Sequence, residues 1–183
     1  MTYTRRGPGQ SYLKTVLQDR INRLVDTKDL DLEINPLKVY EKMVNDIEAE
    51  KGSLPANLPK SVTADEAAAN STVQQIIEPR VRILMDIANT FLDTIIAGLD
   101  EAPYGIRWIC KQIRSLSKRK YPDAGDQTIC TLIGGFFFLR FINPAIVTPR
   151  SYMLIENMPG DNPRRTLTYV CFRNVRFVFV NYR

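Results

Sequence analysis

Residues 136–149 read FFFLRFINPAIVTP, an apolar run that contains one arginine and ends at a proline-marked break. The apolar residues on both sides of Arg140 predict a helix that is buried on most of its surface. A guanidinium without partners in such surroundings is costly, because its five N–H donors lose their hydrogen bonds to water. We therefore expect Arg140 to be buried and to donate to main-chain carbonyls at the helix end, and we take it as the first candidate functional residue.

Outward from this run, apolar residues recur at three- and four-residue intervals along most of the chain, which predicts an all-α fold. The expected helices follow the Gly7–Gly9 turn, the N-cap Asn35, a capping box of Thr63 with Glu66, Pro103, and the N-cap Asp126. The third of these should end at Gly98 and be kinked or split at Pro79. The helix from Asp126 is apolar nearly all round, so we expect it to be the central one.

The last stretch of the chain breaks this pattern. Residues 169–180 are rich in β-branched and aromatic side chains and lack helical spacing, which predicts an irregular or strand-like tail. We therefore divide the chain into an N-terminal segment (1–9), one helical domain (10–168) and a divergent tail (169–183).

The composition excludes several classes of chemistry. Among the 183 residues there is no histidine, which removes Ser-His-Asp and Cys-His catalysis and histidine-ligated metals. No phosphate-binding loop of the GxxxxGK type is present, and the cysteines at 110, 130 and 171 are few and far apart, as expected of reduced thiols. We expect no cofactor and no metal.

The formal net charge of +5 favours acidic partners in general. Basic residues gather at Lys111, Arg114 and 118–120, which leaves open a helical binder of nucleic acid or acidic lipid. We rank this alternative low, because the cluster lacks interleaved aromatic residues and any known nucleic-acid motif.

Phe138-Leu139-Arg140, followed by Asn143-Pro144-Ala145, resembles the signature of the Ras GTPase-activating (Ras-GAP) domain. Three further segments, at 6–10, 103–109 and 121–125, are similar to the IQGAP-related branch of that family. The resemblance covers about residues 5–168. It implies an incomplete all-helical Ras-GAP bundle whose shallow groove binds the switch regions of a GTP-loaded small GTPase.

The resemblance also implies roles for single residues. In the family, the arginine of this motif braces the loop that carries a separate arginine finger, and that role transfers to Arg140. Phe137 and Leu139 would pack the groove floor, although a plain core role is the favoured alternative for both. Asn143 and Pro144 would fix the turn after the helix.

The resemblance further indicates a truncated fragment. The finger should lie upstream of Arg6, so neither Arg5 nor Arg6 is taken as the finger. Downstream, Phe172 falls near a position where active relatives carry a lysine that contacts the GTPase.

Two functions follow from the resemblance. The first is promotion of GTP hydrolysis on a Ras-family GTPase by the full-length protein. The alternative is an IQGAP-type scaffold module that binds Rho-family (Cdc42/Rac-like) GTPases without catalysis. The resemblance therefore implies a GTPase regulator and not an enzyme in its own right. In both cases we expect no direct contact with nucleic acid. We expect peripheral contact with the membrane through the GTPase. We expect a cytoplasmic protein that acts at the cell cortex or the inner face of the plasma membrane.

Overall fold

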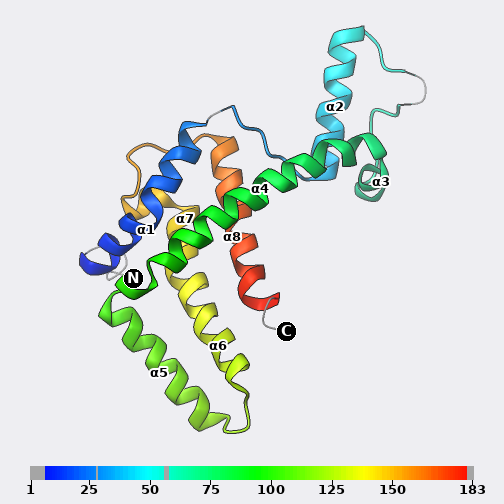
Figure 1. Ribbon diagram of the computed structural model, residues 1–183. Helices are drawn as coiled ribbons and strands as arrows, with labels where there is room; N and C mark the ends of the chain where they lie inside the picture. The colour runs from blue at the N-terminus through cyan, green and yellow to red at the C-terminus, as the bar shows by residue number, and fades with distance from the viewer. Residues whose placement is uncertain (1–6, 28, 56–57, 181–183) are drawn as a thin grey trace. The chain divides into compact units, whose positions relative to one another are not determined.

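The computed structural model describes residues 7–27, 29–55 and 58–180, and every regular element within these ranges is helical (Figure 1). The predicted all-α fold is therefore confirmed. The chain divides into two compact units, residues 1–30 together with 86–183, and residues 31–85. Helix α4, Ser71–Ala97, contributes residues to both units. The domain boundaries at residues 9 and 168 stay a prediction.

The smaller unit contains helix α2, Pro36–Lys51, helix α3, Ala64–Ala69, and the first part of α4. Its core is formed by apolar side chains from all three helices: Val39, Tyr40, Val44, Ala67, Val73 and Ile77. Both helix starts that the sequence predicted here are confirmed. The Asn35 side chain accepts hydrogen bonds from the N–H groups of Leu37 and Lys38, and Thr63 and Glu66 form the capping box.

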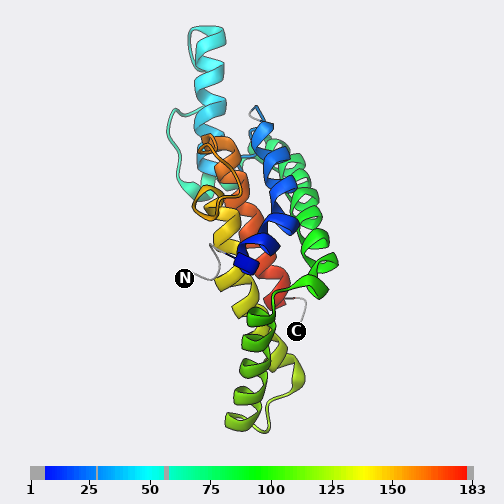
Figure 2. The same cartoon turned by 90° about the vertical axis from the view of Figure 1, so that its left-hand side faces the viewer.

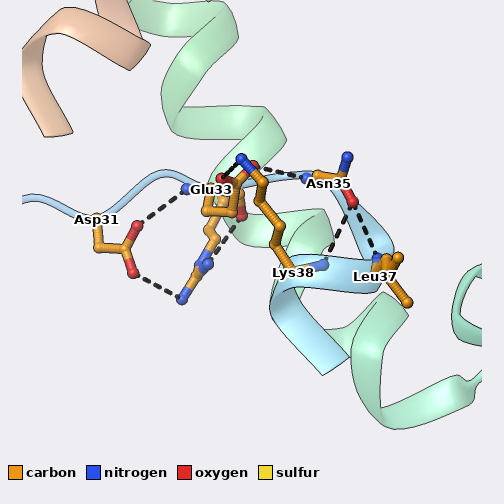
Figure 3. Close-up of polar contacts among 6 residues, drawn as sticks. Asp31, Glu33, Asn35, Leu37 and Lys38 are labelled. Atoms are coloured by element: carbon orange, nitrogen blue, oxygen red, sulfur yellow. Dashed lines mark hydrogen bonds and ion pairs between the residues drawn. The ribbon is translucent and has the colours of Figure 1, made fainter. Parts of the chain in front are cut away.

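A polar network holds the irregular segment that leads into α2 (Figure 3). The N–H of Glu33 donates to Asp31 Oδ1 (3.2 Å), the N–H of Asn35 donates to Glu33 Oε1 (2.9 Å), and Arg80 donates to the Glu33 carbonyl (2.8 Å). Burial raises the pKa of Asp31, but the hydrogen bond from Lys42, together with the Glu33 N–H and Arg80, brings that pKa below its ordinary value. The network therefore fixes the segment before α2 to α4.

The predicted long helix after Thr63 is divided, but not at Pro79. The break falls at Asn70, whose Oδ1 accepts from the N–H groups of Thr72 and Val73 and so caps α4. Pro79 lies inside α4, which runs on to Ala97. The predicted end at Gly98 is confirmed.

The larger unit is built from eight elements and part of α4. In chain order they are α1 Gly7–Asp26, the 3₁₀-helix η1 Leu99–Glu101, α5 Tyr104–Lys120, α6 Asp126–Gly135, the π-helix η2 Phe136–Ile142, α7 Asn143–Val147, the 3₁₀-helix η3 Pro149–Tyr152 and α8 Asp161–Val180. Its core includes Leu13 and Leu17 of α1, Phe91 of α4, Phe141 of η2 and Leu167 of α8. Helices α5 and α6 lie side by side as an antiparallel pair (Figures 1 and 2).

One prediction for the helix after Gly125 is wrong, and one holds only in part. Asp126 is the first residue of α6 and not its N-cap, and its carboxylate lies 2.7 Å from Lys118 Nζ and 3.5 Å from Arg114 of α5. The predicted helix is central only in its second half, where Phe137 and Ile142 of η2 lie in the core, whereas Leu132 of α6 is exposed. By length and hydropathy alone the stretch Asp126–Val147 could cross a membrane, although its second half lies in the core of the larger unit.

The prediction of an irregular or strand-like tail is also wrong. Helix α8 runs from Asp161 to Val180, and Leu167, Val170 and Cys171 lie buried along one side of it. Residues 181–183 of the predicted tail lie outside the described residues. Tertiary packing at helical spacing has therefore overridden the local β-propensity.

Candidate functional site

The signature segment forms a wide helical turn between two α-helices. Helix α6 passes directly into the π-helix η2, and α7 follows at Asn143. The N–H of Asn143 donates to the carbonyl of Phe138, five residues earlier, which is the π-helical pattern. Such turns are rare and occur frequently at functional sites. The sequence contains no signal for this geometry, because the apolar residues also fit an ordinary α-helix.

Aromatic contacts hold η2 against the core. The ring of Phe141 stacks on Tyr12 of α1 at 5.8 Å between centroids, and Phe137 contacts both Phe138 and Phe141. Phe137 is 8% exposed, so its core role is the one that the structure shows. Burial raises the pKa of the Tyr12 hydroxyl to about 12, with a further contribution from the charge of Glu101. Tyr12 therefore remains neutral beneath the segment.

Arg140 is exposed, and the prediction of a buried arginine is wrong. Within the described residues it donates to no carbonyl and forms no ion pair. Its neighbour Leu139 is 42% exposed, so these two residues share the outward side of η2 while Phe137, Phe141 and Ile142 face the core. The guanidinium remains hydrated, so no internal hydrogen bonds are needed to offset its desolvation.

Asn143 and Pro144 do not form the predicted turn: they are the first two residues of α7, which follows η2 directly and ends at Val147. Asn143 is 7% exposed, and its Nδ2 donates to the carbonyl of Cys171 in α8 at 3.4 Å. The Cys171 thiol lies 3.6 Å from the carbonyl of Asn143, so the side chain of each residue contacts the main-chain carbonyl of the other. Burial raises the pKa of this thiol to about 12. The half-buried Pro144 is the second residue of α7, and its carbonyl accepts from Thr148. These contacts tie α7 to α8.

An apolar cavity of about 440 Å³ opens between α5, α6 and η2. Its lining comes from Leu99, Ala102, Ile106, Arg107, Cys110, Cys130, Ile133, Gly134 and Phe137. Phe137 is the predicted site residue that reaches it. The predicted residues thus separate into a buried group of Phe137 and Asn143 and an exposed pair of Leu139 and Arg140. Burial raises the pKa of the Cys110 thiol at this cavity.

Comparison with known proteins identifies the family. The sequence profile described as "GTPase-activator protein for Ras-like GTPase" matches residues 1–171. The chain belongs to this Ras-GAP family. The match contains the whole η2–α7 segment, so the exposed pair of Leu139 and Arg140 lies within the matched part of the chain.

The relatives include activating-like proteins from two lineages. The chain is 36% identical to "Ras GTPase-activating-like protein gapA" of Dictyostelium discoideum over 171 residues, which cover 93% of this chain and 20% of gapA. It is 30% identical to "Ras GTPase-activating-like protein IQGAP2" of Mus musculus, over 91% of this chain and 11% of that protein. A third relative, rgaA of Dictyostelium discoideum, is 34% identical over 93% of this chain and 20% of its own length. The chain thus spans a fifth or less of these relatives.

Proposed function

We propose that this chain contributes to a surface that binds a GTP-loaded Ras-family GTPase, and that the full-length protein promotes GTP hydrolysis through it. Membership of the Ras-GAP family supports the proposal. The observation that carries it is the exposed pair of Leu139 and Arg140, which stands on a π-helical turn anchored by Phe137, Phe141 and Asn143. Leu139 and Arg140 are exposed on a helical segment whose opposite side is packed in the core, so both side chains are accessible to a partner.

GTP hydrolysis on the GTPase requires few groups from the regulator. The GTPase holds the nucleotide, the magnesium ion and the attacking water, so the regulator supplies charge stabilisation and positioning. We assign Arg140 as a positioning residue, whose N–H donors hold the main chain of a finger-bearing loop. Asn143 holds α7 in place through its hydrogen bond to α8. No histidine is required for any of these roles.

The second candidate function is a scaffold that binds a GTP-loaded Rho-family GTPase without accelerating hydrolysis. The similarity to IQGAP2 favours it, together with the IQGAP-like segments at 6–10, 103–109 and 121–125. The residue at the finger position of the full-length protein separates the two functions. Arginine there favours activation, and an uncharged residue favours the scaffold. In both cases we propose a cytoplasmic location, with membrane contact through the lipid-anchored GTPase.

The test uses the full-length protein. Single-turnover phosphate release is measured from Ras-family and Rho-family GTPases loaded with GTP, and binding is measured with a non-hydrolysable analogue. We expect acceleration on a Ras-family GTPase, and Arg140→Ala should lower it by roughly tenfold or more. The matched control is Arg82→Ala, which removes another exposed helical arginine and should change neither measurement.

The outcomes separate the candidates. Tight binding to a Rho-family GTPase with no acceleration of any GTPase would replace activation by the scaffold function. No binding to a GTPase of either family would refute both.

A further inference from the structure

Helix α5 has an outward face that is both basic and aromatic. Its inner side packs on α6 through Ile106, Ile109 and Ile113, which are buried or half-buried. On the opposite side Tyr104 is 74% exposed and Trp108 50% exposed. Because residues three and four apart share a helix face, Arg107, Lys111, Arg114 and Lys118 form one row beside these two rings. The row borders α6, since Arg107 also lines the cavity between α5 and α6, and Asp126 of α6 pairs with Arg114 and Lys118.

The charge of this face is uncompensated over much of its length. All the charged residues of α5 are basic: Arg107, Lys111, Arg114, Lys118, Arg119 and Lys120. The formal charge of the whole chain is only +5, so the remainder of the chain is close to neutral. Asp126 pairs with Lys118 and Arg114 across the hairpin. In the part of the chain that the structure describes, Arg107, Lys111 and Arg119 form no ion pair.

The sequence prediction ranked a lipid-binding role low because no aromatic residues were interleaved with the basic cluster. The structure corrects that reason. Tyr104 and Trp108 precede the cluster in sequence but lie on the same face of α5 as Arg107 and Lys111. At the far end of the helix Lys120 lies 5.4 Å from the ring centroid of the exposed Tyr121.

We infer that this face of α5 docks directly on an anionic phospholipid bilayer, with the helix lying parallel to the membrane plane. The helix has 17 residues and is about 25 Å long, and its row of cations is straight, so that all of them can reach one flat layer of headgroups. Tyrosine and tryptophan are the residues that settle at the membrane interface, with the ring among the acyl chains and the polar atom in water.

The docking is peripheral and independent of the GTPase. The isoleucines of α5 remain packed on α6, so only the exposed rings and the lysine and arginine side chains enter the headgroup layer. A nucleic acid would also attract the cations, but two rings at one end of a straight helix do not form a stacking platform for successive bases. We therefore commit to the bilayer and treat nucleic acid as an outcome of the test.

The chain carries its own probe for this contact, because Trp108 is its single tryptophan. The 183-residue chain is titrated with phosphatidylcholine vesicles that contain or lack phosphatidylserine. With phosphatidylserine we expect co-sedimentation, a blue shift of Trp108 emission and protection from acrylamide. Without phosphatidylserine, or after addition of high salt, we expect none of these, since the attraction is electrostatic.

Two variants test the face itself. Each basic side chain near the surface contributes a factor of about five to partitioning, so Arg107→Gln with Lys111→Gln should weaken binding by about 25-fold and disturbs the helix least. Arg107→Glu with Lys111→Glu changes the charge by twice as much and should weaken binding by roughly 600-fold. The matched control is Lys14→Glu with Lys51→Glu, which changes the net charge equally at exposed sites on α1 and α2 and should bind nearly as the parent. Circular dichroism at 222 nm checks that each variant keeps its helices.

Three results would overturn the inference. The first is failure of the parent chain to bind anionic vesicles. The second is binding that leaves Trp108 emission unchanged, or that the control pair weakens as much as the α5 pair. The third is tighter binding to a single-stranded oligonucleotide than to phosphatidylserine vesicles in the same buffer. No GTPase is present in any of these measurements, so they stand apart from the proposed function.

Discussion

Gly98 permits close packing of the end of α4 against Val16 of α1, and its replacement by alanine should be destabilising. Gly98 follows the last residue of α4 with ordinary dihedral angles (φ −90°, ψ 5°), so its role is not conformational. A Cβ at this position would lie 2.6 Å from Cγ1 of Val16 in α1 and 3.4 Å from the carbonyl oxygen of Thr94. Val16 is 2% exposed, so its side chain has no open space to enter.

The size of the effect follows from this contact. Carbon atoms pack at about 3.5–4.0 Å, so one side must move by roughly 1 Å. Overpacking of this kind costs about 1–3 kcal/mol, and alanine recovers ~0.5–1 kcal/mol by restricting the unfolded chain. We expect Gly98→Ala to lower the free energy of unfolding by about 1–2 kcal/mol. Val16→Ala alone should cost about 2 kcal/mol through lost burial and a cavity.

The double variant gives the sharper test. In Gly98→Ala with Val16→Ala, the new methyl group occupies space that Cγ1 vacates. The pair should therefore cost about 1–2 kcal/mol less than the sum of the single changes. Urea unfolding is followed by Trp108 fluorescence, because Trp108 lies in the same compact unit. The control is Gly125→Ala, where a Cβ would meet nothing within 4 Å. Costs that add to within about 0.5 kcal/mol, or a Gly98→Ala variant as stable as the control, would refute the packing argument.

Three further predictions concern single residues. Arg140→Ala should change the free energy of unfolding by less than about 0.5 kcal/mol, since the side chain is exposed. A loss well above this in urea unfolding would support a buried Arg140 that braces the main chain. Asn35→Ala should cost about 1 kcal/mol by removing the cap of α2, while Asn35→Asp retains it; equal melting temperatures for the two variants would contradict this role. The Cys171 thiol has a pKa raised from 9.0 to about 12 by burial, so its contribution to stability is complete below pH 9 and is lost as the pH rises toward 12. Its share of the loss is about 1.4 kcal/mol per pH unit, and urea midpoints should fall less steeply above pH 9 in Cys171→Ala than in the parent.

The parts of the fold that the sequence predicted correctly are those decided by neighbouring residues. Asn35 before Pro36 and Thr63 with Glu66 cap their helices because the donors and acceptors lie within three residues of each other. The Asp126 prediction used the same logic and was wrong, because α6 begins one residue earlier than predicted: Gly125 is its N-cap and Asp126 its first residue, with the carboxylate 2.7 Å from Lys118 Nζ.

The C-terminal prediction failed for a related reason. Residues 169–180 have high β-propensity, yet Leu167, Val170 and Cys171 place their side chains on one side of α8 and bury them in the core. Asn143 adds a hydrogen bond to the Cys171 carbonyl, across 28 positions of sequence. Such long-range contacts are invisible to a local reading, and they outweigh a propensity difference of about 1 kcal/mol or less per residue.

The prediction for Arg140 was wrong about which side of the helix the side chain faces. An arginine in an apolar run must be buried only if its position faces the core, and at η2 the helix turns Leu139 and Arg140 outward while Phe137 and Phe141 hold the opposite side. The same finding changes what the residue can do. A buried guanidinium would have spent its donors on its own chain, whereas an exposed one keeps them for a loop or a partner. If Arg140→Ala leaves stability unchanged and still lowers activation by the full-length protein, then Arg140 acts on a group outside this fold.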